Sequence, residues 1–146
     1  MNTLQINKII ENDFYAKKYY LCTVAFDQLP QYFKYPSCFI VNNQKSNQPG
    51  QHWIAIYFGK NQKAEFFDSF GQNAKYYSLE NYIKIRSKGF VNSNIKLQSN
   101  YSTFCGYYCV LFILLKTRGW SLQRIFRQFK SPRLNDKLIK RLINKF

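Results

Sequence analysis

The stretch HWIAIYFGKNQKAEFFD, residues 52–68, decides the fold that we expect. Residues 52–58 are rich in β-branched and aromatic side chains, which favours a strand. The GKNQ that follows is typical of a turn, and residues 64–68 return as a second strand. Because the two strands of such a hairpin run antiparallel, His52 and Asp68 should lie side by side at one end of a sheet.

This pair of side chains is suited to acid–base chemistry. A carboxylate can accept a hydrogen bond from one imidazole nitrogen, which leaves the other nitrogen to face a nucleophile. His52 is the only histidine, so a histidine-dependent enzyme has one candidate base. Asp68 also begins the sequence Asp-Ser-Phe-Gly, which is typical of a turn. The two interpretations of Asp68 do not exclude each other.

The candidate nucleophile is Cys105, the first residue of an apolar segment, CGYYCVLFILLK, that predicts a helix over residues 105–116. A thiol at a helix N-terminus lies at the positive end of the helix dipole, which favours the reactive thiolate. Gly106 carries no side chain that would crowd an approaching substrate. The alternative is that Cys105 is a small core residue, the commoner role of a free cysteine.

The other three cysteines are weaker candidates. Cys109 lies one turn inside the same apolar helix, where burial should raise its pKa and limit access. Cys22 and Cys38 lie in apolar stretches, as core or spare thiols do. With one histidine and no C-x-x-C pair, we expect no metal site. Inside a cell the thiols should be reduced.

A fourth candidate residue precedes the nucleophile. Residues 95–98 alternate between apolar and polar side chains and predict a short strand that ends at Gln98. Acyl transfer needs hydrogen-bond donors at the developing oxyanion, and the Gln98 amide with the Cys105 backbone N–H can provide two. The alternative is that Gln98 is an ordinary polar loop residue.

The remaining segments place helices at both ends of the chain. Thr3 should cap a helix that ends near Phe14, and Ser78 a helix that ends at Gly89. Residues 21–26 are a short apolar segment, and residues 38–41 predict a buried strand. Two basic amphipathic helices are expected at residues 122–129 and 133–145. The pattern predicts an α+β fold, a small central, mostly antiparallel sheet flanked by helices, in a single domain of residues 1–146.

The chain is strongly basic, with 22 Lys and Arg against 7 Asp and Glu and a formal charge of +15. Residues 116–146 hold ten basic residues and one acid, Asp136. This charge favours a polyanion such as nucleic acid as a partner of the C-terminal helices, the alternative being a compositional bias without a partner. No apolar run could cross a bilayer and no secretory signal is visible, so we expect no membrane contact and an intracellular, monomeric protein.

The sequence resembles the adenovirus maturation protease (adenain) family, which is related to the SUMO- and ubiquitin-like-specific cysteine proteases. In both groups a His-Trp pair opens a strand, an acid follows on the next strand, and a Gln precedes a Cys-Gly helix start. The matching elements, in chain order, are His52-Trp53, Asp68, Gln98 and Cys105-Gly106. The order is distinctive because papain-like enzymes place the cysteine first. The chain departs from the adenovirus enzymes in having Asp68 instead of Glu and in being shorter, like the small adenain-like proteases of virophages and Polinton-type elements.

The resemblance implies an adenain-like, papain-like cysteine protease core with its nucleophile at a helix N-terminus. It implies catalysis by Cys105, His52 and Asp68 without a metal or a required cofactor, and Gln98 in the oxyanion hole. Trp53 is expected to line the substrate site beside the small Gly106 of the Cys-Gly start.

The resemblance also implies a substrate and a place of action. The substrate would be a capsid or core precursor cut at small-residue, Gly-containing sites during virion maturation, in the virion and the host cell interior. DNA, which adenain-branch enzymes use as a cofactor, would be the activating polyanion. One alternative is a SUMO- or ubiquitin-like-modifier-specific protease with the same catalytic residues. Another is a non-enzymatic, basic nucleic-acid-binding protein, whose thiol would be inert.

Overall fold

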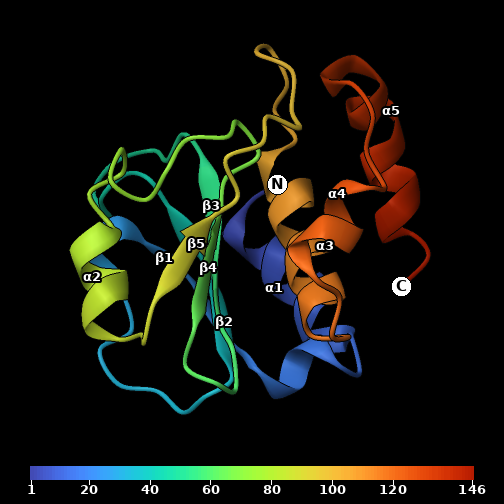
Figure 1. The fold of residues 1–146 in the computed structure, drawn as a ribbon. Helices are drawn as coiled ribbons and strands as arrows, with labels where there is room; N and C mark the ends of the chain where they lie inside the picture. The colour runs from blue at the N-terminus through green and yellow to red at the C-terminus, as the bar shows by residue number, and fades with distance from the viewer.

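Five strands form one mixed sheet whose spatial order follows the chain, β1-β2-β3-β4-β5 (Figure 1). The computed structural model describes all of residues 1–146. The central pairs β2–β3 and β3–β4 are antiparallel, and the outer pairs β1–β2 and β4–β5 are parallel. The strands are β1 (Tyr20–Ala25), β2 (Ser37–Asn42), β3 (Trp53–Phe58), β4 (Ala64–Phe67) and β5 (Phe90–Asn92). The helices are α1 (Thr3–Asn12), α2 (Glu80–Ile85), α3 (Cys105–Lys116), α4 (Leu122–Phe126) and α5 (Pro132–Ile143).

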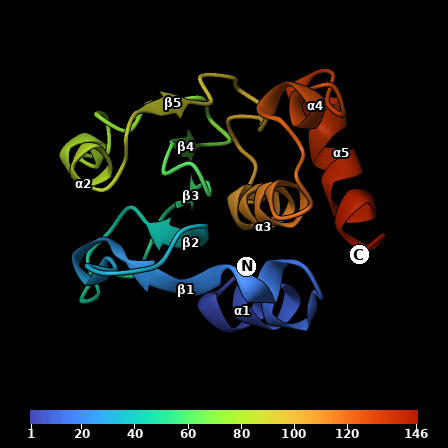
Figure 2. The same cartoon turned by 60° about the horizontal axis from the view of Figure 1, so that its bottom comes forward.

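The sheet separates two apolar layers, because successive residues of a strand point to opposite faces. All six residues of β2 are buried. Its Cys38 and Ile40 join the layer formed with α1, α3, α4 and α5, whereas Phe39 and Val41 join the layer formed with α2. Figure 2 shows this division, with α1, α3 and α5 on one side of the sheet and α2 on the other.

Helix α3 is the core helix of the molecule. Ten of its 12 residues are buried, as expected of a helix that is apolar on all sides. It packs on β3, with α1 and α5 against it, and the Phe112 ring stacks on Phe67 of β4 at a centroid distance of 4.6 Å. This packing fixes the first residue of α3 relative to the sheet. No helix is long and apolar enough to cross a membrane.

The predicted α+β fold is confirmed, and so are the hairpin of β3 and β4 and the bounds of α3. The antiparallel pairings expected of the sheet occupy its centre. The two outer pairs are parallel. An irregular segment connects β1 to β2, and a longer segment that contains α2 connects β4 to β5.

Two helix caps were predicted at the wrong residue. Helix α1 begins at Thr3, but its cap is Asn2, which forms a capping box with Gln5. Ser78 has a φ of 59° and does not cap α2, which begins at Glu80 after Leu79. A hydroxyl residue near a helix start predicts a cap only to within a residue or two.

The predicted strand at residues 95–98 is wrong. The backbone N–H groups of Leu97 and Gln98 both donate to one acceptor, the Ser69 carbonyl oxygen, so no ladder of paired residues forms. The edge strand is instead β5, three residues that the sequence pattern did not reveal. Helices α4 and α5 are shorter than predicted and end at Phe126 and Ile143.

Candidate active site

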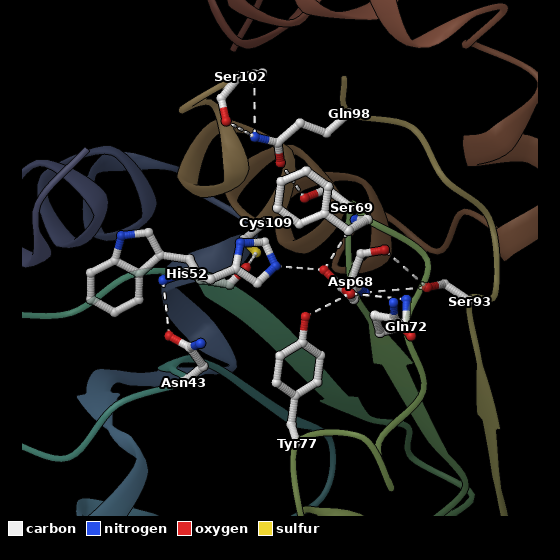
Figure 3. A network of polar contacts seen from close by, with 12 residues as sticks. Asn43, His52, Asp68, Ser69, Gln72, Tyr77, Ser93, Gln98, Ser102 and Cys109 are labelled. Atoms are coloured by element: carbon white, nitrogen blue, oxygen red, sulfur yellow. Dashed lines mark hydrogen bonds and ion pairs between the residues drawn. The ribbon is translucent and has the colours of Figure 1, made fainter. Parts of the chain in front are cut away.

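His52 and Asp68 meet at one end of the central hairpin, as predicted. His52 directly precedes β3 and Asp68 directly follows β4, and these strands pair antiparallel with Ala55 opposite Phe67. The His52 Nε2 atom lies 2.6 Å from Asp68 Oδ1 (Figure 3). Because Asp68 occupies Nε2, the nitrogen left to face a nucleophile is Nδ1.

Asp68 is fully buried, and hydrogen bonds compensate for the burial of its carboxylate. Besides His52, Oδ1 accepts the Phe70 N–H at 3.1 Å. The other oxygen, Oδ2, accepts the Gln72 N–H at 3.0 Å and the Tyr77 hydroxyl at 2.9 Å. The Gly71 N–H also donates to the Asp68 carbonyl, which closes a turn. Asp68 is therefore both a turn residue and the partner of the histidine.

The His52 imidazole packs near two aromatic rings. Its centroid lies 4.8 Å from that of Phe70 and 6.0 Å from that of Tyr77, with both rings inclined by about 30° to it. The Asn43 side chain accepts the His52 backbone N–H at 3.0 Å. Burial would lower the pKa of His52, but its hydrogen bonds and charge interactions with Asp68 and Cys105 raise this pKa to about 9.

Cys105 is the first residue of α3, and its thiol forms a hydrogen bond with the His52 side chain. No side chain caps this end of the helix, so its first N–H groups stay available to a negative charge. Burial would raise the pKa of the thiol, but the hydrogen bond and charge of His52, with the backbone N–H groups of Trp53 and Gly106, lower it. A lowered thiol pKa beside a raised imidazole pKa favours a thiolate–imidazolium pair.

Gln98 is fully buried and its side chain is fixed by two serines. Its Oε1 accepts the Ser69 hydroxyl at 2.6 Å. Its Nε2 donates to the Ser102 carbonyl at 2.7 Å and to the Ser102 hydroxyl at 3.2 Å. Ser69 is the neighbour of Asp68, so one turn positions both the acid and the amide.

These residues open into one cavity of about 750 Å³. His52, Gln98 and Cys105 line it, together with Trp53. Gly106 does not itself line the cavity; it is buried in the first turn of α3, next to Trp53, which does. Most of the lining is uncharged and polar, contributed by the end of β1, the loop of residues 42–51 and the segment before α3.

The remaining thiols are placed as predicted. Cys109 is fully buried, its thiol donates to the Trp53 carbonyl at 3.2 Å, and burial raises its pKa well above the usual value. Cys38 is buried and Cys22 half-buried, and burial raises the pKa of both. Neither lies at the cavity that holds Cys105.

Several supporting residues of the site carry no distinctive signal in the sequence. The supporting side chains are those of Asn43, Ser69, Phe70, Tyr77, Ser93 and Ser102. Only the turn pattern at residues 68–71 hinted at two of them. The others are ordinary polar or aromatic residues, and only their contacts in the fold distinguish them.

The sequence matches no protein-family model and no curated protein. Among solved structures, the chain is similar to crystal structures of the ASFV pS273R protease. One alignment has a TM-score of 0.61 at 15% identity and covers 97% of this chain and 66% of that chain. Another, with the selenomethionine protein, has a TM-score of 0.48 at 21% identity and covers 72% and 43% of the two chains.

The chain therefore spans less than two thirds of the length of the protease it matches. At 15% sequence identity, the similarity shows a shared fold. Nearly the whole chain takes part in the longer alignment, from α1 to the C-terminal helices. The α+β fold of this chain is thus one that is known to carry a protease.

Proposed function

We propose that this protein is a cysteine endopeptidase with Cys105 as nucleophile, His52 as general base and Asp68 as the residue that orients the histidine. The observation that carries the proposal is the contact of one imidazole with both a buried carboxylate and a thiol of lowered pKa. A fold shared with the ASFV pS273R protease supports it. A purely structural cysteine would need neither the helix N-terminus nor the histidine.

The chemistry follows from these positions. The Cys105 thiolate attacks the scissile carbonyl carbon, and the carbonyl electron pair moves to the oxygen. The Nδ1 proton of the His52 imidazolium passes to the leaving amine as the C–N bond breaks. Asp68 holds the ring in the required orientation and stabilises its charged form. His52 then takes a proton from water, which hydrolyses the thioester.

The oxyanion would be stabilised by the Cys105 backbone N–H and the Gln98 amide. Both Gln98 N–H bonds point toward Ser102, and the one at 3.2 Å to its hydroxyl is the weaker. We expect bound substrate to break this weaker hydrogen bond, so that the Gln98 N–H donates to the oxyanion instead. Trp53 would line the substrate site beside Gly106.

As substrate we propose a viral capsid or core precursor, cut at small-residue, Gly-containing sites during virion maturation in the host cell interior. The resemblance to adenain and the origin of the structural neighbour in ASFV support this choice. A SUMO- or ubiquitin-like modifier is the alternative substrate for the same residues. Precursor-derived Gly-containing peptides and modifier-derived reporters, offered in parallel, distinguish the two.

The test is the pH dependence of Cys105 alkylation by iodoacetamide, compared between wild type and His52→Ala. Because the thiolate is the reactive form, we expect labelling of Cys105 well below the ordinary thiol pKa of about 8.5, slowed in the variant. Cys22, a half-buried thiol of raised pKa, is an internal reference in each sample. Labelling of Cys105 that follows an ordinary thiol, unchanged by the variant, would leave a basic binding protein with a structural cysteine.

The two pKa shifts also predict how cleavage depends on pH. Below the lowered pKa of Cys105 the thiol is protonated, and above about pH 9 His52 loses the proton that the leaving amine needs. Peptide cleavage should therefore fall on both sides of this range. Alkylation should continue above pH 9, because it needs only the thiolate.

Cys105→Ala should abolish cleavage while its circular dichroism spectrum stays that of wild type.

A second activity, nucleic-acid binding by α4 and α5, is proposed on the distribution of charge. Eight basic residues of this region are exposed: Arg124, Arg127, Lys130, Arg133, Lys137, Lys140, Arg141 and Lys145. The single acid, Asp136, points inward, where it accepts the Tyr108 hydroxyl at 2.8 Å and the Ser99 hydroxyl. All charged residues on the exposed face of α5 are therefore positive, which suits a phosphate backbone.

A further inference from the structure

Met1 lies against the first turn of α3, beside the nucleophile Cys105. The Trp53 indole Nε1–H donates to the Met1 carbonyl oxygen at 3.0 Å. A Cβ placed on Gly106 would stand 2.9 Å from Met1 Cβ, 3.3 Å from Trp53 Cδ1 and 3.4 Å from Met1 Sδ. Any residue larger than glycine at this position would therefore push Met1 away from the helix.

The position of Met1 is fixed by the helix that follows it. Asn2 and Gln5 form a capping box, in which the Gln5 N–H donates to Asn2 Oδ1 and the Asn2 N–H to Gln5 Oε1, both at 2.9 Å. Helix α1 is in turn anchored by Ile6 and Ile10, which are fully buried in the layer that contains α3. Met1 is thus held between the capped end of α1, the start of α3 and the Trp53 indole.

The same residues line the candidate active site. Met1, with the two residues after it, borders the cavity of about 750 Å³ that holds His52 and Cys105. An acyl group bound to the Cys105 sulfur would lie in the cavity that Met1 and Trp53 line, next to Gly106, the residue against which both side chains pack. Its side chain would meet the apolar surface of Met1 and Trp53.

We propose that Met1 is a specificity-determining residue of this site. Together with Trp53 it forms an apolar wall beside Gly106 that leaves room for glycine, and excludes larger side chains, on the acyl side of the scissile bond. This inference rests on the proposed cysteine protease function and adds to it the residue that selects small side chains.

Two chloromethyl ketones, acetyl-glycyl and acetyl-leucyl, test the wall without requiring turnover. In each, a bond forms between the Cys105 sulfur and the methylene carbon while the C–Cl bond breaks and chloride leaves. Because a few methylene groups against a tight wall change discrimination by roughly 10-fold or more, we expect wild type to react at least about tenfold faster with the glycyl probe. Equal rates, after correction for each probe's reaction with free cysteine, would overturn the proposal.

Gln5 provides a matched pair of variants, because it holds the Asn2 N–H in the capping box but does not line the cavity. Gln5→Ala removes the acceptor of the Asn2 N–H and should loosen Met1, so the leucyl-to-glycyl rate ratio should rise toward that of free cysteine. Gln5→Glu keeps an acceptor and should keep the wild-type ratio. If Met1 had only a structural role, Gln5→Ala would slow both probes alike and leave the ratio unchanged.

Met1 is the only methionine in the chain, so protein grown with [methyl-¹³C]methionine gives a single labelled methyl signal. We expect this signal to shift when the glycyl probe occupies Cys105, and to remain in place if Met1 lies outside the occupied site. The two proposals can fail separately. A Cys105 that iodoacetamide does not label at low pH contradicts the protease, whereas a reactive Cys105 with equal probe rates contradicts only the role of Met1.

Discussion

At the scale of single residues, Asp68 has two roles: its carbonyl closes a turn, and its carboxylate accepts a hydrogen bond from the His52 Nε2–H. An asparagine can keep the turn but cannot stabilise an imidazolium. We therefore predict that Asp68→Asn lowers kcat/KM by roughly 10²- to 10⁴-fold and lowers the alkaline limit of the pH profile. Tyr77→Phe is the matched control, since it removes one of the hydrogen bonds to Asp68 and keeps the ring beside His52. It should cost far less. Wild-type turnover in Asp68→Asn would reduce Asp68 to a turn residue.

At the scale of elements, the end of α1 is tied to the end of α3. Arg118 makes two bonds to the buried Asp13 carboxylate, at 3.0 and 2.6 Å. Burial would raise the pKa of Asp13, but Arg118 and two backbone N–H groups lower it. A depressed carboxyl pKa stabilises the fold above the unfolded pKa, and this stability is lost as pH falls through the folded value. Arg118→Met should therefore lower the free energy of unfolding by about 1 to 3 kcal/mol at pH 7 and by less at pH 3, as measured by urea denaturation. Lys84→Met, which breaks an exposed pair with Glu80, should change little at either pH.

At the scale of the whole molecule, the largest share of the net charge of +15 lies at the C-terminal end, where residues 116–146 hold ten basic residues and one acid. Lysines and arginines that neutralise phosphates release counterions, so DNA affinity should fall steeply with salt, by a slope of about 0.9 per phosphate contacted. Replacing Arg133, Lys137 and Arg141 by Gln should weaken binding and reduce this slope. The matched control replaces Lys60, Lys63 and Lys88, exposed residues near the β3–β4 turn, and removes the same charge. An equal loss from both sets in a fluorescence anisotropy titration would show that net charge acts without a specific face.

The sequence by itself determined the elements whose signals are local. Periodicity and turn residues predicted the β3–β4 hairpin and the bounds of α3, and chemistry selected His52 and Cys105 from among few candidates. Only the tertiary structure decided the supports of the site. The Ser69 hydroxyl reaches Gln98 across 29 positions, and Trp53 reaches Met1 across 52. Such contacts leave no mark on local patterns, because they depend on how α1, α3 and the sheet pack, and packing is a property of the whole chain.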